Sequence, residues 1–344
     1  MAMGNKYGAH RVLEPKGLLP QAADRIDNTM EIFDNEILVD VSALNIDAAS
    51  FRQLWEAARG DEEELKKSII SIVNQRGKMQ NPVTGSGGML MGSVAEIGSA
   101  LKDRDLKPGD RIATLVSLSL TPLHIEEIIA VFPDIERVEV KGRAILFESG
   151  IYAKLPSDMS ENLALAVLDV AGAPAQTAKI VHEGDSVLIL GAGGKSGMLC
   201  CYEAMKRVGP SGHVVGMSRN DRPKDLLLDN GLCHKFFVAN AQNPVDVLEK
   251  ALDANGGREY DVVINVVNID GTEMSSILPV REGGLVYFFS MATSFTRAAL
   301  GAEGVGKDVT MIVGNGYTKN HAEFSLQVLR ESEALKSIFE TMYV

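Results

Sequence analysis

The chain has few cysteines, no long apolar run and no cluster of basic residues, and each absence excludes a class of protein. Three cysteines in 344 residues, odd in number and scattered, indicate a reducing cytoplasm. The longest apolar runs, such as 285–289, fall far short of the ~20 residues of a membrane helix, and the first residues lack a secretion-signal core. A net charge of −12 without a basic run argues against nucleic-acid binding.

The pattern of apolar segments and turns in residues 1–158 differs from that in the rest of the sequence. Short apolar segments at 36–44, 92–98 and 110–115 are separated by turns rich in glycine and proline, which is typical of a small barrel-like β domain. Helices are expected at 48–60 and 61–74, followed by a polar loop at 75–88.

From residue 159 onward, strands and helices alternate, which predicts an α/β domain with a doubly wound parallel sheet. The expected strands are 186–190, 213–217, 235–238, 261–267, 285–289 and 309–313. The expected helices are 160–181, which Pro174 should kink or break, 198–208, 223–230 and 244–254, and a Gly-rich loop runs to 306. One or two helices at 318–344 are expected to pack back towards the N-terminal domain, so the predicted domains are 1–158, 159–317 and 318–344.

The most informative motif is the run 186–197, SVLILGAGGKSG. An apolar strand ends in four glycines and a helix follows, which directs backbone N–H groups and a helix N-terminus at a pyrophosphate. Those glycines are Gly191, Gly193, Gly194 and Gly197, and side chains there would block the approach of the ligand. A P-loop is disfavoured because Ile189 stands where that motif has a glycine. The motif therefore predicts dinucleotide binding, with a ligand-free helix cap as the alternative.

The residues after the second strand bear on the choice of cofactor. NAD-selective folds place a carboxylate there, whereas this chain has Ser218, Arg219 and Asn220. A hydroxyl and a guanidinium suit the 2′-phosphate of NADP, so NADP is expected, with NAD as the alternative because Asp221 lies one step further. Lys195 and Ser196 in the glycine loop are candidate pyrophosphate contacts, although Lys195 could equally extend into water.

Several stretches resemble the medium-chain dehydrogenase/reductase superfamily. They are the strand pair around EILVDV and ALNID, the segments GSVAEIG and LKPGDRI, and AKLP at the entry to the cofactor domain. The resemblance implies a GroES-like N-terminal β-barrel domain followed by a Rossmann domain. The zinc ligands of the alcohol-dehydrogenase branch are missing, since Asp47 stands at the first cysteine position and Gly88 and Met89 stand at the His-Glu pair. A zinc-free member without a bound metal is therefore expected.

More narrowly, the opening GNKYGAHRVLEPKGLLPQAADRIDN, with NIDAASF and GSGGMLMGSV, resembles the L-erythro-3,5-diaminohexanoate dehydrogenase family. That resemblance implies NAD(P)-dependent oxidative deamination of a diamino acid to a β-keto acid and ammonia in bacterial lysine fermentation, by a cytoplasmic homodimer. Two alternatives remain open: a zinc-free quinone or enoyl reductase of the same superfamily, and a non-catalytic nucleotide sensor.

Three residues are candidates for the chemistry on the substrate. Asp47, just past a strand, could bind a substrate ammonium or accept its proton, or it could form an Asx turn or cap the helix at 48–56. The same alternatives apply to Ser50. His124 falls in 117–125, where the superfamily has its substrate loop, and could shuttle a proton; a structural role is the alternative. Glu126 is a further candidate acid or base, and at least one of Glu126 and Glu127 is expected to be a solvated charge.

Two polar residues follow strands of the parallel sheet. Asn268 and Ser290 come after the strands expected at 261–267 and 285–289, at the edge where ligands bind, so they could contact the nicotinamide half of the cofactor or serve as turn residues. Tyr317 and His321 are weaker candidates from the last segment.

Overall fold

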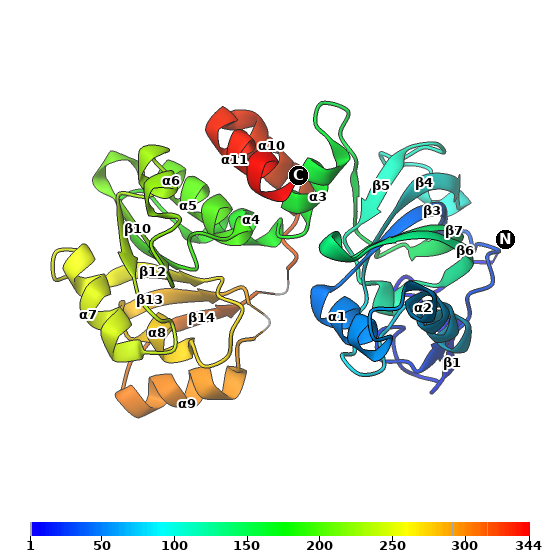
Figure 1. Cartoon of the computed structure of the whole chain (residues 1–344), viewed down its shortest axis with the longest axis horizontal. Helices are drawn as coiled ribbons and strands as arrows, with labels where there is room; N and C mark the ends of the chain where they lie inside the picture. Colours follow the sequence, from blue (N-terminus) through cyan, green and yellow to red (C-terminus); the bar gives the residue numbers. More distant parts are fainter. Residues whose placement is uncertain (1, 291, 315) are drawn as a thin grey trace. The chain divides into compact units, whose positions relative to one another are not determined.

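The computed structural model describes residues 2–290, 292–314 and 316–344. The chain divides into two compact units, Met1–Ser157 and Asp158–Val344 (Figure 1). Each unit has its own hydrophobic core.

The N-terminal unit is built on a six-stranded antiparallel sheet with the order β6-β7-β3-β4-β5-β8. Its strands are β3 (Glu36–Ile46), β4 (Gly88–Ile97), β5 (Arg111–Thr114), β6 (Leu123–Phe132), β7 (Arg137–Phe147) and β8 (Tyr152–Lys154). The alternating burial of β6 shows that one face of this strand is buried and the other is solvated, which is typical of an antiparallel sheet. A small ladder of β1 (Val12–Glu14) and β2 (Arg25–Ile26) precedes the sheet.

Two helices, α1 (Ala48–Ala57) and α2 (Glu62–Arg76), share the core of this sheet through residues such as Leu54, Ile69 and Val73. The helix α2 begins after Asp61, whose side chain accepts a hydrogen bond from the Glu64 N–H, and ends at Gly77 in the left-handed conformation. The first unit also contains the short 3₁₀ helices η1 (Ala9–Arg11), η2 (Ser99–Leu101), η3 (Leu118–Leu120) and η4 (Pro133–Ile135). The second unit contains η5 (Gly209–Ser211).

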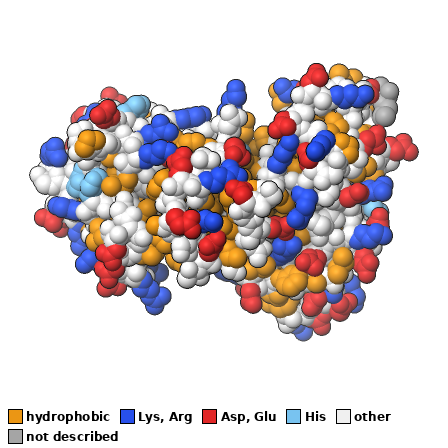
Figure 2. Space-filling view, turned by 90° about the horizontal axis from the view of Figure 1, so that it is seen from above, with side chains coloured by type: hydrophobic (Ala, Val, Ile, Leu, Met, Phe, Trp, Pro, Cys, Tyr) orange, Lys and Arg blue, Asp and Glu red, His pale blue; other side chains and the backbone are white. Residues whose placement is uncertain are grey.

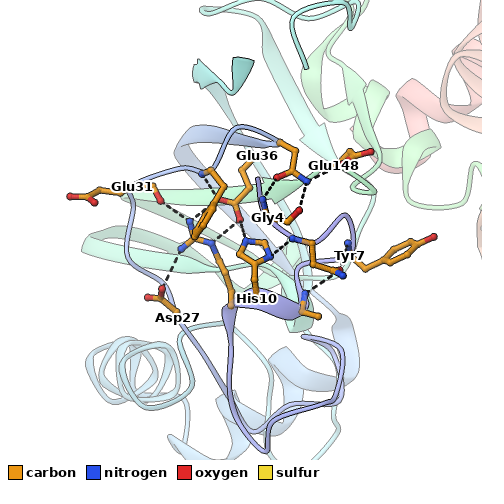
Figure 3. Close-up of polar contacts among 12 residues, drawn as sticks. Gly4, Tyr7, His10, Asp27, Glu31, Glu36 and Glu148 are labelled. Atoms are coloured by element: carbon orange, nitrogen blue, oxygen red, sulfur yellow. Dashed lines mark hydrogen bonds and ion pairs between the residues drawn. The ribbon is translucent and has the colours of Figure 1, made fainter. Parts of the chain in front are cut away.

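A buried ionic network fastens the N-terminal segment to the first residue of β3 (Figure 3). The Arg11 guanidinium donates to both carboxylate oxygens of Glu36, at 2.8 and 2.6 Å, and to the carbonyl oxygens of Thr29 and Glu31. His10 Nε2 lies 2.9 Å from Glu36 Oε1, and its Nδ1 accepts a hydrogen bond from the Asn5 N–H. Because these buried charges are paired and hydrogen-bonded, the network is a structural clamp.

The second unit contains a six-stranded parallel sheet with the order β11-β10-β9-β12-β13-β14, the arrangement of a Rossmann fold. Its strands are β9 (Ser186–Leu190), β10 (His213–Ser218), β11 (Lys235–Val238), β12 (Tyr260–Asn265), β13 (Val280–Phe288) and β14 (Thr310–Val313). Its helices are α3 (Glu161–Leu168), α4 (Gly172–Ile180), α5 (Lys195–Val208), α6 (Lys224–Asp229), α7 (Pro244–Ala254), α8 (Glu273–Ile277), α9 (Phe295–Val305), α10 (His321–Glu331) and α11 (Glu333–Tyr343).

Alternate residues of β9 face opposite cores. Val187 and Ile189 belong to the core with α3, α4, α5, α10 and α11, whereas Leu188 and Leu190 belong to the core with α7, α8 and α9. The doubly wound prediction is therefore confirmed. The segment 318–344 forms two helices whose apolar side chains lie in the first of these cores; its predicted packing towards the N-terminal domain stays a prediction.

The break expected in the helix at 160–181 is present, but it lies at 169–171, before Pro174, so that the proline falls in the first turn of α4, where no N–H is needed. Two other expectations about local structure are wrong. The Gly-rich stretch before 306 contains the helix α9. The segment around His124 is the start of strand β6 and is no loop, because it pairs with β7, with His124 opposite Arg143.

Charged side chains of both signs are interspersed over the face seen in Figure 2. Among the residues described, none of the helices has the length and apolar character needed to cross a membrane.

Candidate active site and cofactor site

The glycine turn after β9 is held in a close-packed form. Gly191 has φ +91°, and both its N–H and that of Ala192 donate to the Met217 carbonyl oxygen at the end of β10. A Cβ on Gly197 would lie 2.1 Å from the Gly191 carbonyl oxygen. Gly191 and Gly197 are therefore required by the turn itself.

Gly194 leaves a space at the N-terminus of α5. Gly194 is the N-cap residue, with no side-chain cap, and a Cβ there would meet nothing nearer than the Gly191 carbonyl oxygen at 3.7 Å. The helix begins at Lys195, three residues earlier than predicted, so the N–H groups of its first turn, including Ser196, point out of the helix. A helix N-terminus with an open cradle fits the pyrophosphate of a dinucleotide.

The end of β10 contacts the glycine turn through Ser218, and Arg219 and Asn220 follow the strand. Ser218 Oγ accepts a hydrogen bond from the Gly193 N–H at 3.1 Å, so its hydroxyl supports the turn. Arg219 and Asn220 are exposed, and the Asn220 side-chain oxygen accepts from the Arg222 N–H in a local turn. A contact of the exposed Arg219 guanidinium with the 2′-phosphate of NADP stays a prediction.

Lys195 has specific partners in its own unit. Its Nζ lies 3.3 Å from Asp169 Oδ2 and 5.5 Å from the centre of the Tyr343 ring. An ion pair and a cation–π contact therefore hold the ammonium at the start of α5, with Tyr343 supplied by the end of the C-terminal helix. The sequence predicted that Lys195 would contact a pyrophosphate or extend into water, and it did not predict these two partners.

The structure brings Asn268 and Ser290 together. The Ser290 hydroxyl donates to the Asn268 side-chain oxygen at 3.3 Å, and Ser290 Oγ accepts from the Ala292 N–H. Asn268 lies three residues beyond the end of β12, and Ser290 lies two residues beyond the end of β13. Both strands end earlier than predicted. A contact with nicotinamide stays a prediction.

Sequence reasoning missed Asn265, the last residue of β12. Its buried amide donates to Thr272 Oγ1 and Ser276 Oγ at 2.9 and 2.8 Å, and its oxygen accepts from the Val267 N–H. The amide thereby shapes the loop that carries Asn268. The only signal in the sequence was an asparagine that interrupts the apolar run 262–267.

Asp47 lies at the junction of β3 and α1, with an exposed side chain. It occupies the N-cap position but makes no side-chain cap; instead its Oδ2 accepts a hydrogen bond from the Gly87 N–H at 3.1 Å. A Cβ on Gly87 would lie 2.5 Å from the Met79 carbonyl oxygen, so the packing of this loop requires glycine at that position. Asp47 is therefore an oriented surface carboxylate, and its role in chemistry stays a prediction.

Ser50, by contrast, is fully buried. Its hydroxyl lies 2.5 Å from Thr84 Oγ1 and 2.6 Å from Ser86 Oγ, both in the loop that carries Gly87. This hydroxyl contact joins the helix α1 to that loop.

His124 and Glu126 lie on β6, an edge strand of the N-terminal sheet, and both side chains are exposed. Glu126 is paired with Lys141 at 2.8 Å, and that hydrogen bond lowers the pKa of its carboxyl group. Glu127 is also exposed. Glu126 is thus a solvated, ion-paired charge, and the part of the two residues in chemistry stays a prediction.

His321 begins α10 and is buried, with its ring 5.2 Å from that of Tyr317 in an edge-to-face contact. Burial lowers the pKa of His321, so the ring is neutral near pH 7.

No group of three or more His, Cys, Asp or Glu residues in the described part of the chain is arranged to hold a metal ion. Gly88 and Met89, at the His-Glu position of the zinc-dependent branch, open β4 and carry no metal-binding side chain of that pair. The three cysteines are buried thiols; burial raises the pKa of Cys200 to about 12 and that of Cys233 to about 11.

The fold is that of the medium-chain dehydrogenases and reductases. AibC resembles it with a TM-score of 0.55 at 16% identity, covering 89% of this chain and 84% of that chain. The Escherichia coli quinone oxidoreductase complexed with NADPH resembles it with a TM-score of 0.52 at 17% identity, covering 94% and 85%.

A family model described as the L-erythro-3,5-diaminohexanoate dehydrogenase N-terminal domain matches residues 10–156. Curated relatives with the name L-erythro-3,5-diaminohexanoate dehydrogenase are 68% identical over 342 residues in Acetoanaerobium sticklandii, covering 99% of each chain, and 64% identical over 345 residues in Fusobacterium nucleatum, covering 100% of each. This chain belongs to the L-erythro-3,5-diaminohexanoate dehydrogenase family, and is an oxidoreductase. The expected family and fold class are confirmed.

Proposed function

We propose that this chain catalyses the NADP-dependent oxidative deamination of L-erythro-3,5-diaminohexanoate to 5-amino-3-oxohexanoate and ammonia. Identity of 68% over 99% of both chains to a relative that carries the name of this dehydrogenase supports the proposal. The open cradle at Gly194 supports a dinucleotide as the cofactor. Nicotinamide, when bound, supplies the acceptor for the hydride that leaves C3 of the substrate.

In this proposal the second unit binds and selects the cofactor. The first turn of α5 holds the pyrophosphate through backbone N–H groups, and Arg219 binds the 2′-phosphate with Ser218 fixed against the glycine turn. A solvated NAD ribose hydroxyl would gain little from that guanidinium. NADP is therefore the preferred cofactor in the proposal.

The substrate reaches the enzyme as a cation at each amine, because such amines titrate near pH 10. The 3-amine must lose a proton before hydride leaves, and the iminium that results is hydrolysed by water. Asp47 is proposed to bind the 3-ammonium and accept this proton, with its carboxylate oriented by the Gly87 N–H.

Asp47→Asn tests the proposed base, because it keeps the shape and removes the charge. We expect kcat/KM to fall by ~10²-fold or more, the scale of general-base catalysis, while NADP affinity and melting temperature are retained. Unchanged turnover would remove Asp47 from the chemistry and direct attention to His124.

The overall reaction is tested separately by ammonia release. Purified protein with the diamino acid and NADP⁺ should form NADPH and ammonia in equal amounts, and the reverse reaction should consume NADPH only when ammonia is present. Reduction of quinones or enoyl substrates without ammonia would instead support the reductase alternative.

We further propose that the protein is a homodimer in the cytoplasm. The free, buried thiols of all three cysteines are compatible with a reducing compartment. Light scattering should give a mass near twice 37.0 kDa, and a monomer mass would contradict the dimer.

A further inference from the structure

The loop between α2 and β4, residues 77–87, carries the Gly87 N–H that binds Asp47, and we call it the Asn81 loop. One end is anchored by Lys78, which is fully buried and donates to the Pro20 carbonyl oxygen at 2.6 Å. Burial lowers the pKa of Lys78 to about 8. The loop is therefore fixed to the N-terminal segment before it reaches Asn81.

Asn81 is fully buried and uses both halves of its side-chain amide. Its oxygen accepts from the N–H groups of Val83 and Thr84, at 2.8 and 3.4 Å, which folds the loop upon itself. Its backbone adds two further bonds, from its N–H to the Ser86 carbonyl oxygen and from the Gly85 N–H to its own carbonyl oxygen. Asn81 therefore determines the shape of the loop.

The other half of the amide reaches α1. Asn81 Nδ2 donates to Gln53 Oε1 at 2.8 Å and to the Ser50 carbonyl oxygen at 3.3 Å. Ser50 contacts Thr84 and Ser86 of the same loop through its hydroxyl. The Asn81 loop and the N-terminal part of α1 are thus joined by one polar network through Ser50 and Gln53.

Asp47 lies between the two parts that this network joins. Its backbone is the N-cap of α1, and its carboxylate accepts from Gly87 in the Asn81 loop. The Asp47 N–H also donates to the Gly87 carbonyl oxygen, at 3.4 Å. A change in the spacing of helix and loop would alter the direction of the carboxylate.

We propose that Asn81 is a positioning residue for the reaction, which acts through Asp47 by holding the Gly87 N–H at a fixed place relative to α1. This inference rests on the proposed role of Asp47 as the base. Small displacements of a catalytic group have large kinetic effects, since about 1 Å can cost ~10²-fold in rate. We expect a partial loss, about tenfold, because the backbone contacts of Asp47 with Gly87 and Phe51 remain.

Asn81→Asp is the most selective variant. It keeps an oxygen for the N–H groups of Val83 and Thr84, but replaces the donor that faces the Ser50 carbonyl oxygen with an acceptor. The matched control is Gln80→Ala in the same loop, which removes bonds to the carbonyl oxygens of Gln21 and Gly85 and none to α1.

The test is a double-mutant cycle on kcat/KM with Asp47→Asn. We expect Asn81→Asp to lower kcat/KM about tenfold with Asp47 present and less than twofold in the Asp47→Asn background. Gln80→Ala should change kcat/KM less than twofold, and NADP affinity should stay the same in every variant. A merely structural role of Asn81 would give equal losses in both backgrounds, and that result would overturn the inference.

Other outcomes separate this inference from the proposed function. If Asp47→Asn has no effect, both the base and the positioning role fail, while ammonia release still tests the reaction. A tenfold loss in Gln80→Ala would assign the effect to the loop in general and overturn the role of Asn81. If Asn81→Asp does not fold, Gln53→Ala is the substitute variant, because it removes the hydrogen bond from Asn81 to the half-buried Gln53 side chain on α1. We then expect kcat/KM to fall two- to threefold with Asp47 present, and again a smaller loss in the Asp47→Asn background.

Discussion

Replacing Gly194 with valine should abolish cofactor binding and leave the second unit folded. Gly194 has φ −91° and ψ 172°, a region that valine adopts readily, and its Cβ would have no neighbour nearer than 3.7 Å. The fold therefore tolerates the side chain, which would project into the space in front of the α5 N-terminus.

The size of the effect follows from the bonds that the side chain would prevent. Each N–H bond to a charged phosphate contributes about 1.5–3 kcal/mol, so losing two of them costs about 3–6 kcal/mol. That corresponds to at least about a hundredfold weaker binding. Valine is a poorer N-cap than glycine, a cost of about 1 kcal/mol, which lowers the melting temperature by about 2–4 °C in a unit of this size.

Calorimetric titration with NADP and thermal melting together decide the outcome. Gly197→Val is the contrasting variant, because its Cβ would overlap the Gly191 carbonyl oxygen at 2.1 Å, so it should lose both binding and stability. An unchanged dissociation constant in a folded Gly194→Val protein would refute the assignment of the cradle to the cofactor.

Further predictions concern single charges. Arg219→Ala should weaken NADP binding by about 1.5–3 kcal/mol and leave NAD binding nearly unchanged, and equal losses would show that Arg219 does not bind the phosphate. Asp169→Asn should release Lys195 and tighten NADP binding by up to about fivefold in titrations, since partly exposed ion pairs contribute at most about 1 kcal/mol. Burial and the neighbouring His213 lower the pKa of His234, so the folded state favours the neutral ring; denaturant melts should show stability falling as pH drops below about 6.5, and less so in His234→Gln. Activity should survive dialysis against a chelator, and metal analysis showing one zinc per chain that tracks activity would contradict this.

The strands and the glycine turn of the second unit could be predicted because their signals are local. Strands of a parallel sheet that is covered on both faces form continuous apolar runs, such as 186–190 and 213–217, and the turn needs glycine at Gly191 and Gly197 for steric reasons visible in one motif. Within this motif the helix start was displaced, since the N-cap residue Gly194 has no side chain to mark it.

The helix α9 was missed because its glycines were read as loop residues. Gly301 packs so closely on α8 that a Cβ would lie 2.3 Å from Met274 Sδ, so this glycine serves helix packing and no turn. Ser294 caps the start by accepting from the Arg297 N–H, and Gly306 ends the helix in the left-handed conformation. The capping serine and the terminal glycine could be recognised in the sequence. The reason for Gly301 could not, because it is a packing contact with another helix.

The position of His124 depended on pairing that the sequence does not display. The segment before it contains Thr121 and Pro122, which read as loop residues, and β6 becomes a strand through its ladder with β7. The contact of Asp47 with Gly87 likewise joins residues 40 positions apart. Contacts of this range decide the direction of a catalytic side chain, and composition and spacing do not contain them.

The two most chemically suggestive clusters of the N-terminal unit differ in what their polar atoms do. His10, Arg11 and Glu36 resemble a catalytic dyad with a cation, but Glu36 is fully buried and both its oxygens, like both His10 ring nitrogens, are engaged within the chain. At about 3.3 Å per residue, Glu36 lies about 35 Å along β3 from Asp47. At the opposite end of that strand, the exposed carboxylate of Asp47 accepts a hydrogen bond from the Gly87 N–H. The proposed role of Asp47 in chemistry therefore rests on its exposure and on its contact with the Gly87 N–H, and not on the pairing of a histidine with a glutamate.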